Sequence, residues 1–246
     1  MNIGWMAAAW PAPQSVRAGT TLRQGGVSRG PFASLNLGAH VGDDAAAVTE
    51  NRRRLVAELA LSQEPHWLNQ VHGTDVLDLC DITESVYADA VIAESPGQVC
   101  AVLTADCLPV LFCDTAGARI AAAHAGWRGL ANGVLEATLD RLCVPADQVL
   151  VWLGPAIGPA HFEVGEEVRT AFLARHADAV IAFHASRPGH WFADLYSLAR
   201  LRLQARGITR IFGGGRCTFE ETSQFYSYRR DGGVTGRMAS LIWFVA

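Results

Sequence analysis

The chain has 246 residues and a formal net charge of −4 at pH 7, with 50% hydrophobic and 18% charged residues. This composition excludes a disordered chain and a coiled coil, and the mild acidity argues against a dedicated nucleic-acid-binding protein. All 20 basic residues are arginines. The absence of lysine excludes Schiff-base and pyridoxal-phosphate catalysis and the Walker phosphate loop.

The most apolar stretch, 99–113, is interrupted by Thr104, Asp106 and Pro109. It is shorter than the roughly 20 residues of a membrane-spanning helix, so it predicts buried strands and no membrane association. The apolar N-terminus has no positive flank, since the first basic residue is Arg17, and no secretory signal is expected. The six cysteines show no disulfide spacing, which predicts a cytoplasmic protein with reduced thiols.

No repeat, linker or low-complexity tract divides the chain, so one domain is expected over residues 1–246. A strand at 16–22 and a glycine-rich loop at 25–42 come first. Asp43 or Asp44 then caps a helix that runs to about Leu61, and its arginines at 52–54 are expected to be largely solvated. Short apolar runs between turn signals predict strands at 66–71, 76–79, 88–93, 99–104, 108–113 and 119–124.

The second half of the chain mixes both kinds of element. Helices are predicted at 130–142 and 164–176, and a third helix is capped by Asp194 and ends near Arg206. Further strands are predicted at 149–153, 208–212, 225–228 and 239–245. Strands outnumber helices and do not strictly alternate with them, which predicts an α+β fold of mixed sheets packed together and flanked by helices.

Three short segments carry potential metal ligands at the ends of predicted strands. These ligands are His72, Cys107 and His124. Two imidazoles and one thiolate suit zinc with a fourth position left open. Because the gaps between them are long, the fold rather than a local finger would assemble such a site. From spacing alone the signal is weak, because a lone buried cysteine or histidine is usually an ordinary residue of the core.

An anion site is a second possibility in the segment that contains His124. Gly126 and Gly129 permit a tight strand-to-helix turn, and Arg128 lies between them. Backbone N–H groups at the start of that helix, together with Arg128, would hold phosphate or another anion. The alternative is that the glycines only let Trp127 pack.

Asp106 precedes the cysteine ligand in an apolar run, where a carboxylate is costly unless it is paired or functional. It would act as a general acid or base, or orient a ligand. A purely structural carboxylate that accepts backbone hydrogen bonds fits the sequence equally well.

These segments are similar to the family described as laccase-domain or multicopper polyphenol oxidase-like proteins, and also as purine nucleoside phosphorylases and peptidoglycan editing factors. The resemblance covers nearly the whole chain, in family order. It includes Leu22-Arg23-Gln24-Gly25-Gly26-Val27-Ser28, the stretch 31–38, Asn69-Gln70-Val71-His72-Gly73, Ala88-Asp89-Ala90, the stretches 104–109, 124–129 and 154–159, Tyr226-Ser227-Tyr228-Arg229-Arg230 and Thr235-Gly236-Arg237.

The resemblance implies zinc ligands at His72, Cys107 and His124 and an α+β fold like that of cysteine-hydrolase toxins. Catalytic roles are expected for Asp106, Cys107 and His124. Residues inside the matching segments are expected to contact the substrate: Arg128, Gln70, Asn36 and Arg23.

Family members are described with phosphorolysis of adenosine, inosine and methylthioadenosine, with adenosine deamination, with phenol oxidation and with editing of a cell-wall precursor. Multicopper chemistry is disfavoured here, because the eight histidines include no His-x-His pair and the only methionines are Met1, Met6 and Met238. We therefore expect a zinc-dependent purine nucleoside phosphorylase with a possible deaminase side activity. Its partners would be a nucleoside and phosphate, and it would be a monomer or a small homo-oligomer.

Three alternatives remain open from sequence. The first is an amidase acting on a cell-wall precursor, with Cys107 as nucleophile and His124 as base. The second is a copper-dependent polyphenol oxidase. The third is a binding or assembly protein with a structural metal, which would require four protein ligands.

Overall fold

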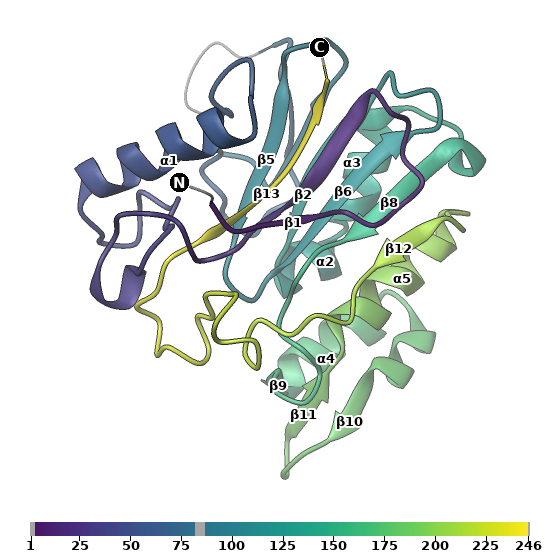
Figure 1. Ribbon diagram of the computed structural model, residues 1–246. Coiled ribbons are helices and arrows are strands. Elements are labelled where there is room, and N and C mark those ends of the chain that lie inside the picture. Colours follow the sequence, from purple (N-terminus) through teal and green to yellow (C-terminus); the bar gives the residue numbers. More distant parts are fainter. Residues whose placement is uncertain (1–2, 82–86, 246) are drawn as a thin grey trace.

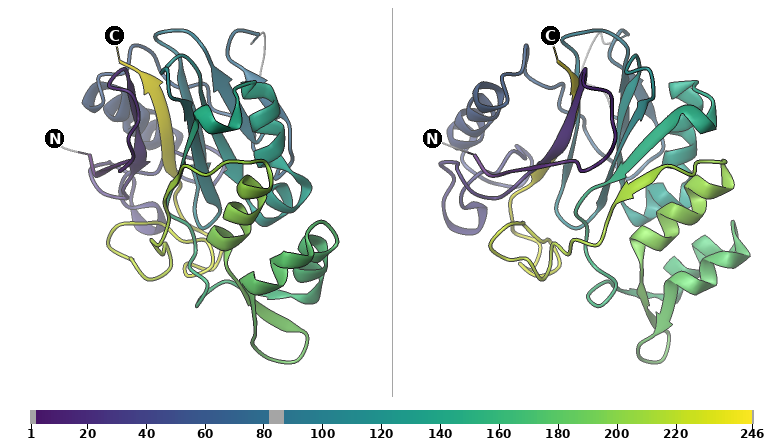
Figure 2. Two further views of the ribbon diagram at one scale, coloured as in Figure 1. Left: turned by 90° about the vertical axis from the view of Figure 1, so that its right-hand side faces the viewer. Right: turned by 45° about the vertical axis from the view of Figure 1, so that its right-hand side comes forward.

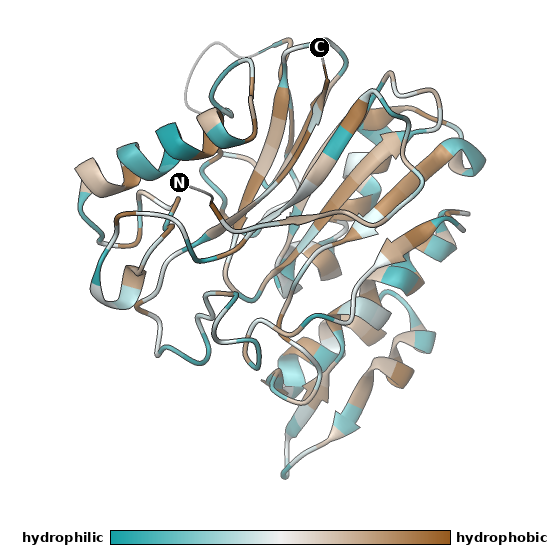
Figure 3. Cartoon of the chain, in the orientation of Figure 1, coloured by the Kyte–Doolittle hydropathy of each residue, from teal (hydrophilic) through white to brown (hydrophobic). Residues whose placement is uncertain are grey.

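Two β-sheets packed face to face form the centre of the protein, in a computed structural model that describes residues 3–81 and 87–245. Figure 1 shows helix α1 (Ala45–Glu58) on the outer side of one sheet, and Figure 2 shows the remaining helices on the outer side of the other. The hydropathy colouring of Figure 3 shows mostly apolar central strands and helices that carry hydrophilic residues. This arrangement confirms the predicted α+β fold of mixed sheets flanked by helices.

The first sheet joins the two ends of the chain. Its order is β1 (Trp5–Ala7), β2 (Val16–Thr21), β13 (Met238–Phe244) and β5 (Val99–Thr104), and all its neighbours are antiparallel. The last strand lies between β2 and β5. Residues from opposite ends of the sequence therefore share one ladder.

The second sheet contains both parallel and antiparallel pairs. The pairs β12–β8 and β3–β4 are parallel, and the other neighbours are antiparallel. Its strand order is β12 (Ile211–Gly213), β8 (Val149–Leu153), β6 (Leu108–Asp114), β7 (Ile120–Ala125), β4 (Ala90–Ala93) and β3 (Val76–Asp78).

The core between the two sheets explains the long apolar runs in the sequence. Every residue of β5, β6 and β7 is buried, because one face meets the other sheet and the opposite face meets helices. Val102 and Ile242 of the first sheet share a cluster with Leu111 and Ile120 of the second. In a strand that is covered on both faces, apolar residues follow one another without alternating with polar ones.

The helices cover the outer faces of the sheets, and none of those in the described residues is long and apolar enough to cross a bilayer. Asp44 caps α1 and Asp194 caps α5, as expected. On the second sheet lie α2 (Trp127–Asn132), α3 (Val134–Leu142) and α5 (Leu195–Ala205). Helix α4 (Glu166–Leu173) packs against α2, beside a small sheet of β9 (Glu163–Gly165), β10 (Phe183–Ala185) and β11 (His190–Ala193).

Several predicted elements are wrong in detail. The helix expected at 130–142 begins earlier, at Trp127, and Gly133 with φ +108° divides it into α2 and α3. The segment 66–71 is irregular and forms an isolated bridge between Asn69 and Tyr87. The segment 225–228 lies in a loop rather than a strand, and the start of the 164–176 helix is part of β9.

The three arginines of α1 differ from the expected solvated face. Only Arg53 is well exposed, at 68% of its side chain. Arg52 and Arg54 are 18% and 17% exposed, because they donate to the backbone carbonyls of Leu37 and Gly25 in the preceding glycine-rich loop. The helix therefore anchors that loop as well as covering the sheet.

Candidate metal centre and active site

The three predicted metal ligands come from three separate elements that meet at one edge of the paired sheets. His124 lies in β7, while Cys107 lies in the turn that crosses from β5 in the first sheet to β6 in the second. His72 is in a loop and has φ +60°, a left-handed conformation that is uncommon for a residue other than glycine. The fold thus brings together residues that are far apart in the sequence.

The ligand atoms of His72, Cys107 and His124 all lie within 4.8 Å of one another. The Cys107 Sγ is 3.8 Å from His72 Nε2, and the two imidazole centroids are 4.8 Å apart. Gly126 leaves the space for this convergence, since a Cβ there would be 2.5 Å from the His72 ring. Among the described residues this group supplies three ligands, so a closed structural site with four protein ligands does not fit.

Asp89 organises the group, a role that the sequence alone does not predict. Its fully buried carboxylate accepts the backbone N–H groups of Val71, His72 and Gly73 at 3.1, 2.9 and 2.6 Å. It also lies 2.8 Å from the Nδ1 atom of His124. This contact orients the imidazole and leaves the Nε2 atom of His124 for a metal. Carboxylates commonly hold metal-binding histidines in this way.

The charges within the group are strongly coupled. Burial by itself would raise the pKa of the Cys107 thiol, but His124 and His72 hold that pKa at about 6. Burial would lower the pKa of His124, but the neighbouring Cys107 and Asp89 raise it to about 9. Burial opposes ionisation of Asp89 too, yet the contacts with His124, Gly73 and Val71 keep the pKa of that carboxyl below its usual value. The arrangement favours a thiolate, which is the form that binds metal.

The three ligands line a cavity of about 440 Å³ that is rich in cationic groups. Arg128, Arg229 and Arg237 all line it, and among the described residues none of the three forms an ion pair. His40 also lines it, with a pKa lowered by burial and by the charges of Arg237 and Arg52. Because these guanidinium groups lack acidic partners, the cavity is suited to an anion.

Aromatic side chains form the other part of the cavity wall, namely Trp127, Phe162 and Tyr228. The guanidinium of Arg128 lies 4.4 Å from the Trp127 ring centroid, and that of Arg229 lies 5.6 Å from the ring of Phe162. The wall therefore offers flat apolar faces next to positive charge. This combination fits a ligand that has both a planar ring system and an anionic group.

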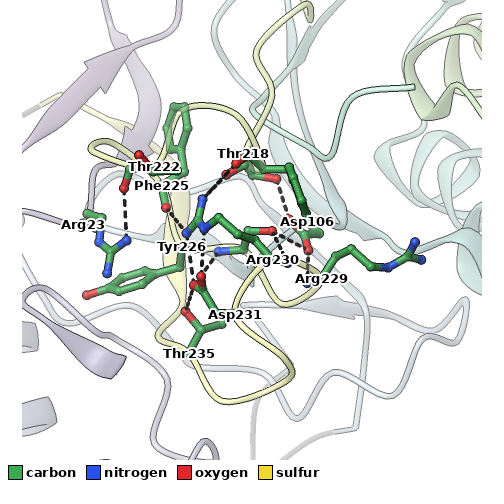
Figure 4. Close-up of polar contacts among 12 residues, drawn as sticks. Arg23, Asp106, Thr218, Thr222, Phe225, Tyr226, Arg229, Arg230, Asp231 and Thr235 are labelled. Atoms are coloured by element: carbon green, nitrogen blue, oxygen red, sulfur yellow. Dashed lines mark hydrogen bonds and ion pairs between the residues drawn. The ribbon is translucent and has the colours of Figure 1, made fainter. Parts of the chain in front are cut away.

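Asp106 lies beside the cysteine ligand but points toward the C-terminal loop, as Figure 4 shows. Its carboxylate accepts hydrogen bonds from Thr218 Oγ1 at 2.6 Å, Ser227 Oγ at 3.0 Å and the Arg229 backbone N–H at 2.7 Å. Its own backbone has φ +88°. These contacts match the structural alternative for Asp106, and they place Arg229 at the cavity.

The predicted substrate-binding residues divide into two groups. Arg128 and Gln70 line the cavity, but the side-chain amide of Gln70 is paired with the backbone N–H and C=O of Leu103 at 2.7 and 2.8 Å. Asn36 and Arg23 do not line it. Asn36 is fully buried and bonds to residues that include Gly38 and Asp43, and Arg23 donates to backbone carbonyls and lies over Tyr226 (Figure 4).

The geometry also corrects the basis for the anion site. Helix α2, which follows Gly126, has only six residues, so its N-terminus alone provides weak support for an anion site. The three arginines supply the positive charge instead. Arg229 and Arg237 lie in two of the segments that resemble the family, 226–230 and 235–237. Their spacing in the sequence does not predict that both side chains line the same cavity.

Comparison with known proteins places the chain in a family. Residues 17–245 match the family model described as multi-copper polyphenol oxidoreductase laccase. The chain belongs to this family. A purine nucleoside phosphorylase of Pseudomonas aeruginosa is 60% identical to this chain, covering 97% of it and 98% of the relative. The Escherichia coli protein named purine nucleoside phosphorylase YfiH is 55% identical, covering 96% and 97%.

Solved structures of this laccase family have the same fold. A Neisseria meningitidis protein superposes with a TM-score of 0.95 at 48% identity, covering 99% of this chain and 100% of its own. YlmD from Geobacillus stearothermophilus has a TM-score of 0.88 at 34% identity, covering 99% and 97%. The cavity and its ligand group therefore belong to a fold that persists while about two thirds of the sequence changes.

Replacing Asp89 tests the metal centre of this laccase-family chain. Asp89→Asn keeps the shape of the side chain but loses the charge and puts a donor where acceptors are needed. We expect its affinity for a divalent probe ion such as Zn²⁺ to fall about 10- to 100-fold, the usual cost of losing a carboxylate that hydrogen-bonds a metal-binding histidine. Competition with a chromophoric chelator measures this change.

The matched control is Asp114→Asn, a second buried carboxylate that accepts the backbone N–H groups of Ala118 and Arg119 outside the cavity. It should lower the free energy of unfolding without weakening ion binding. Equal ion affinity in Asp89→Asn and the unaltered protein would remove Asp89 from the centre.

Proposed function

We propose that this protein is a zinc-dependent purine nucleoside phosphorylase that converts adenosine, inosine or methylthioadenosine and phosphate to the free base and the ribose 1-phosphate. One observation carries the proposal: three arginines that form no ion pair within the described residues line the cavity that the His–Cys–His group also lines. The names of the most similar relatives point to the same activity.

The donor set fits zinc better than copper. One thiolate and two imidazoles leave the cavity side open, the usual form of a catalytic zinc site. A blue-copper site would want a weak axial ligand, often methionine. Met238 is buried in β13 and its sulfur accepts the Tyr226 N–H, while the Met6 sulfur accepts from Arg216. Neither lines the cavity.

Bound zinc would supply a positive charge that polarises phosphate or a water molecule. The arginines hold the phosphate through charge-assisted hydrogen bonds and place it against C1′ of the ribose. An oxygen of hydrogen phosphate forms a bond to C1′ as the glycosidic C–N bond breaks. The purine leaves with the bonding electrons and takes up the proton that the hydrogen phosphate loses. Trp127, Phe162 and Tyr228 offer faces on which the purine stacks.

Asp106 acts in this proposal as a positioning residue. Three donors already engage its two oxygens, so it holds Arg229 and the 218–229 segment at the cavity instead of carrying a proton. Cys107 and His124 contribute as zinc ligands. Deamination of adenosine is a side activity of the same site in this proposal: a water molecule would add to C6 of the purine, and the C6–N bond would break with release of ammonia to give inosine.

Product analysis tests the activity. The zinc-loaded protein is incubated with adenosine, with and without phosphate, and the products are separated by chromatography. Adenine and ribose 1-phosphate should form in equal amounts, and only when phosphate is present. Adenine release at the same rate without phosphate contradicts the proposal, whereas inosine alone would assign the deaminase as the principal activity.

Arg128→Ala should weaken the use of phosphate more than the binding of nucleoside. Arg128 is an exposed side chain of the cavity wall whose guanidinium contacts the Trp127 ring, and the anion contact it supplies is worth about 1.5–3 kcal/mol. We expect the apparent KM for phosphate to rise, or kcat to fall, by roughly 10- to 150-fold. Steady-state kinetics with varied phosphate at saturating adenosine give the result, and deamination should change less.

Arg53→Ala is the matched control, because Arg53 is exposed on α1 and pairs with Glu50 outside the cavity. It should leave phosphate kinetics unchanged. Removal of Arg128 from the site follows if a folded, zinc-loaded Arg128→Ala protein has the phosphate kinetics of the unaltered protein.

A second candidate, the amidase, is favoured by one feature of the geometry. Cys107, His124 and Asp89 are arranged as a nucleophile, a base and an orienting acid, with the Nδ1 atom of His124 held by the carboxylate. A zinc-bound thiolate, however, is partly neutralised and poorly available for attack. Incubation with a cell-wall peptide amide should therefore leave the intact mass of the protein unchanged. An acyl adduct mapped to Cys107 by mass spectrometry, absent in Cys107→Ala, would select the amidase.

A further inference from the structure

A second group of metal-binding side chains lies outside the active cavity. It consists of His161, in the segment between β8 and β9, and Cys217 and Glu220, which follow β12. Their ligand atoms all lie within 4.8 Å of one another. The backbones of the two segments meet at a bridge between Ala156 and Cys217, so the group spans two loops that are held together independently.

The sulfur of this group is held in a defined place. Cys217 is only 8% exposed, and its Sγ accepts the backbone N–H of Gly158 at 3.2 Å. A Cβ at Gly158 would come within 3.0 Å of that sulfur, so the close approach requires glycine. The backbone N–H of Cys217 is bonded to Glu221. These two backbone contacts hold the Cys217 side chain in place.

The other two ligands are aligned beside this sulfur. The Nε2 atom of His161 lies 2.9 Å from Glu220 Oε1, and its ring stacks on Phe219 with centroids 4.3 Å apart. Glu220 is 59% exposed, and with Cys217 it borders a separate cavity of about 460 Å³. The group is thus buried on its sulfur side and open to solvent on its carboxylate side.

We propose that His161, Cys217 and Glu220 bind a second zinc ion, with water at the remaining position. Zinc accepts thiolate, imidazole and carboxylate ligands with bonds of about 2.0–2.3 Å, which places neighbouring ligand atoms roughly 3.3–3.8 Å apart. To reach that spacing the 2.9 Å contact between His161 and Glu220 opens by less than 1 Å, and the more distant ligand atoms, which lie within 4.8 Å, move inward. The proposal does not depend on the activity of the first site.

The location of this second ion gives it a structural role. It fixes the segment that leads to Phe162, in the wall of the active cavity, against the segment that carries Thr218, the hydrogen-bond donor to Asp106. Binding would therefore stabilise the folded state and hold two parts of the cavity wall together.

Cobalt titration of the full-length chain tests the proposal, because a thiolate bound to Co²⁺ gives a charge-transfer absorption band. In Cys107→Ser the first site has lost its sulfur, so a remaining thiolate band comes from another cysteine, and the proposal assigns it to Cys217. We expect one such band in Cys107→Ser, and its loss in Cys107→Ser/Cys217→Ser. In Cys107→Ser/His161→Ala the dissociation constant for cobalt should rise at least tenfold.

Cys107→Ser/Cys143→Ser is the matched control, since Cys143 is exposed and outside both groups, and it should keep the band. Zinc should raise the Tm of Cys107→Ser but not that of the Cys217 double variant. If that variant does not fold, Cys107→Ser/Glu220→Gln supplies the same comparison. No thiolate band in folded Cys107→Ser, or a band that persists without Cys217, overturns the second site and leaves the first site and its activity unaffected.

Discussion

The carboxylate of Asp89 is the contact on which the arrangement of the active site depends. The side chain is fully buried, and burying a charge is costly unless hydrogen-bond donors surround it. Three consecutive backbone N–H groups and one imidazole supply those donors. The same contacts hold the loop that carries His72, with its left-handed backbone, against the strand that carries His124. One buried charge therefore sets the distance between two of the candidate metal ligands.

The turn between β5 and β6 adds the third ligand and connects the metal centre with the C-terminal loop. This turn crosses between the two sheets. Its consecutive residues Asp106 and Cys107 contact different parts of the protein. Cys107 faces the two histidines, whereas Asp106 accepts three hydrogen bonds from segments that follow β12. Since the strands on both sides are fully buried, the turn has little freedom to move. The metal centre and the arginine-bearing wall are thus fixed to one rigid element.

The charge of the cavity separates the activities that have been attached to this family. A multicopper cluster needs closely spaced histidines, and a blue-copper site commonly uses a nearby methionine, whereas the methionine sulfurs described here are engaged elsewhere. Arginines beside flat aromatic faces instead suit a substrate that pairs a ring system with an anion. The physical character of the wall, rather than the metal ligands alone, favours nucleoside and phosphate.

The sequence by itself determined most of the strands, the helix caps and the candidate metal ligands. Continuous apolar runs predicted β5, β6 and β7, and Asp44 and Asp194 cap the helices they were expected to cap. Only the tertiary structure decided that Asp89 organises the ligands, that Arg229 and Arg237 line the cavity, and that Asn36 and Arg23 do not. The reason is that local patterns reflect hydrogen bonding and burial between near neighbours in the chain. The partners of these polar side chains lie on distant segments and meet them only when the two sheets pack. Asn36, for example, accepts a hydrogen bond from the backbone N–H of Arg237.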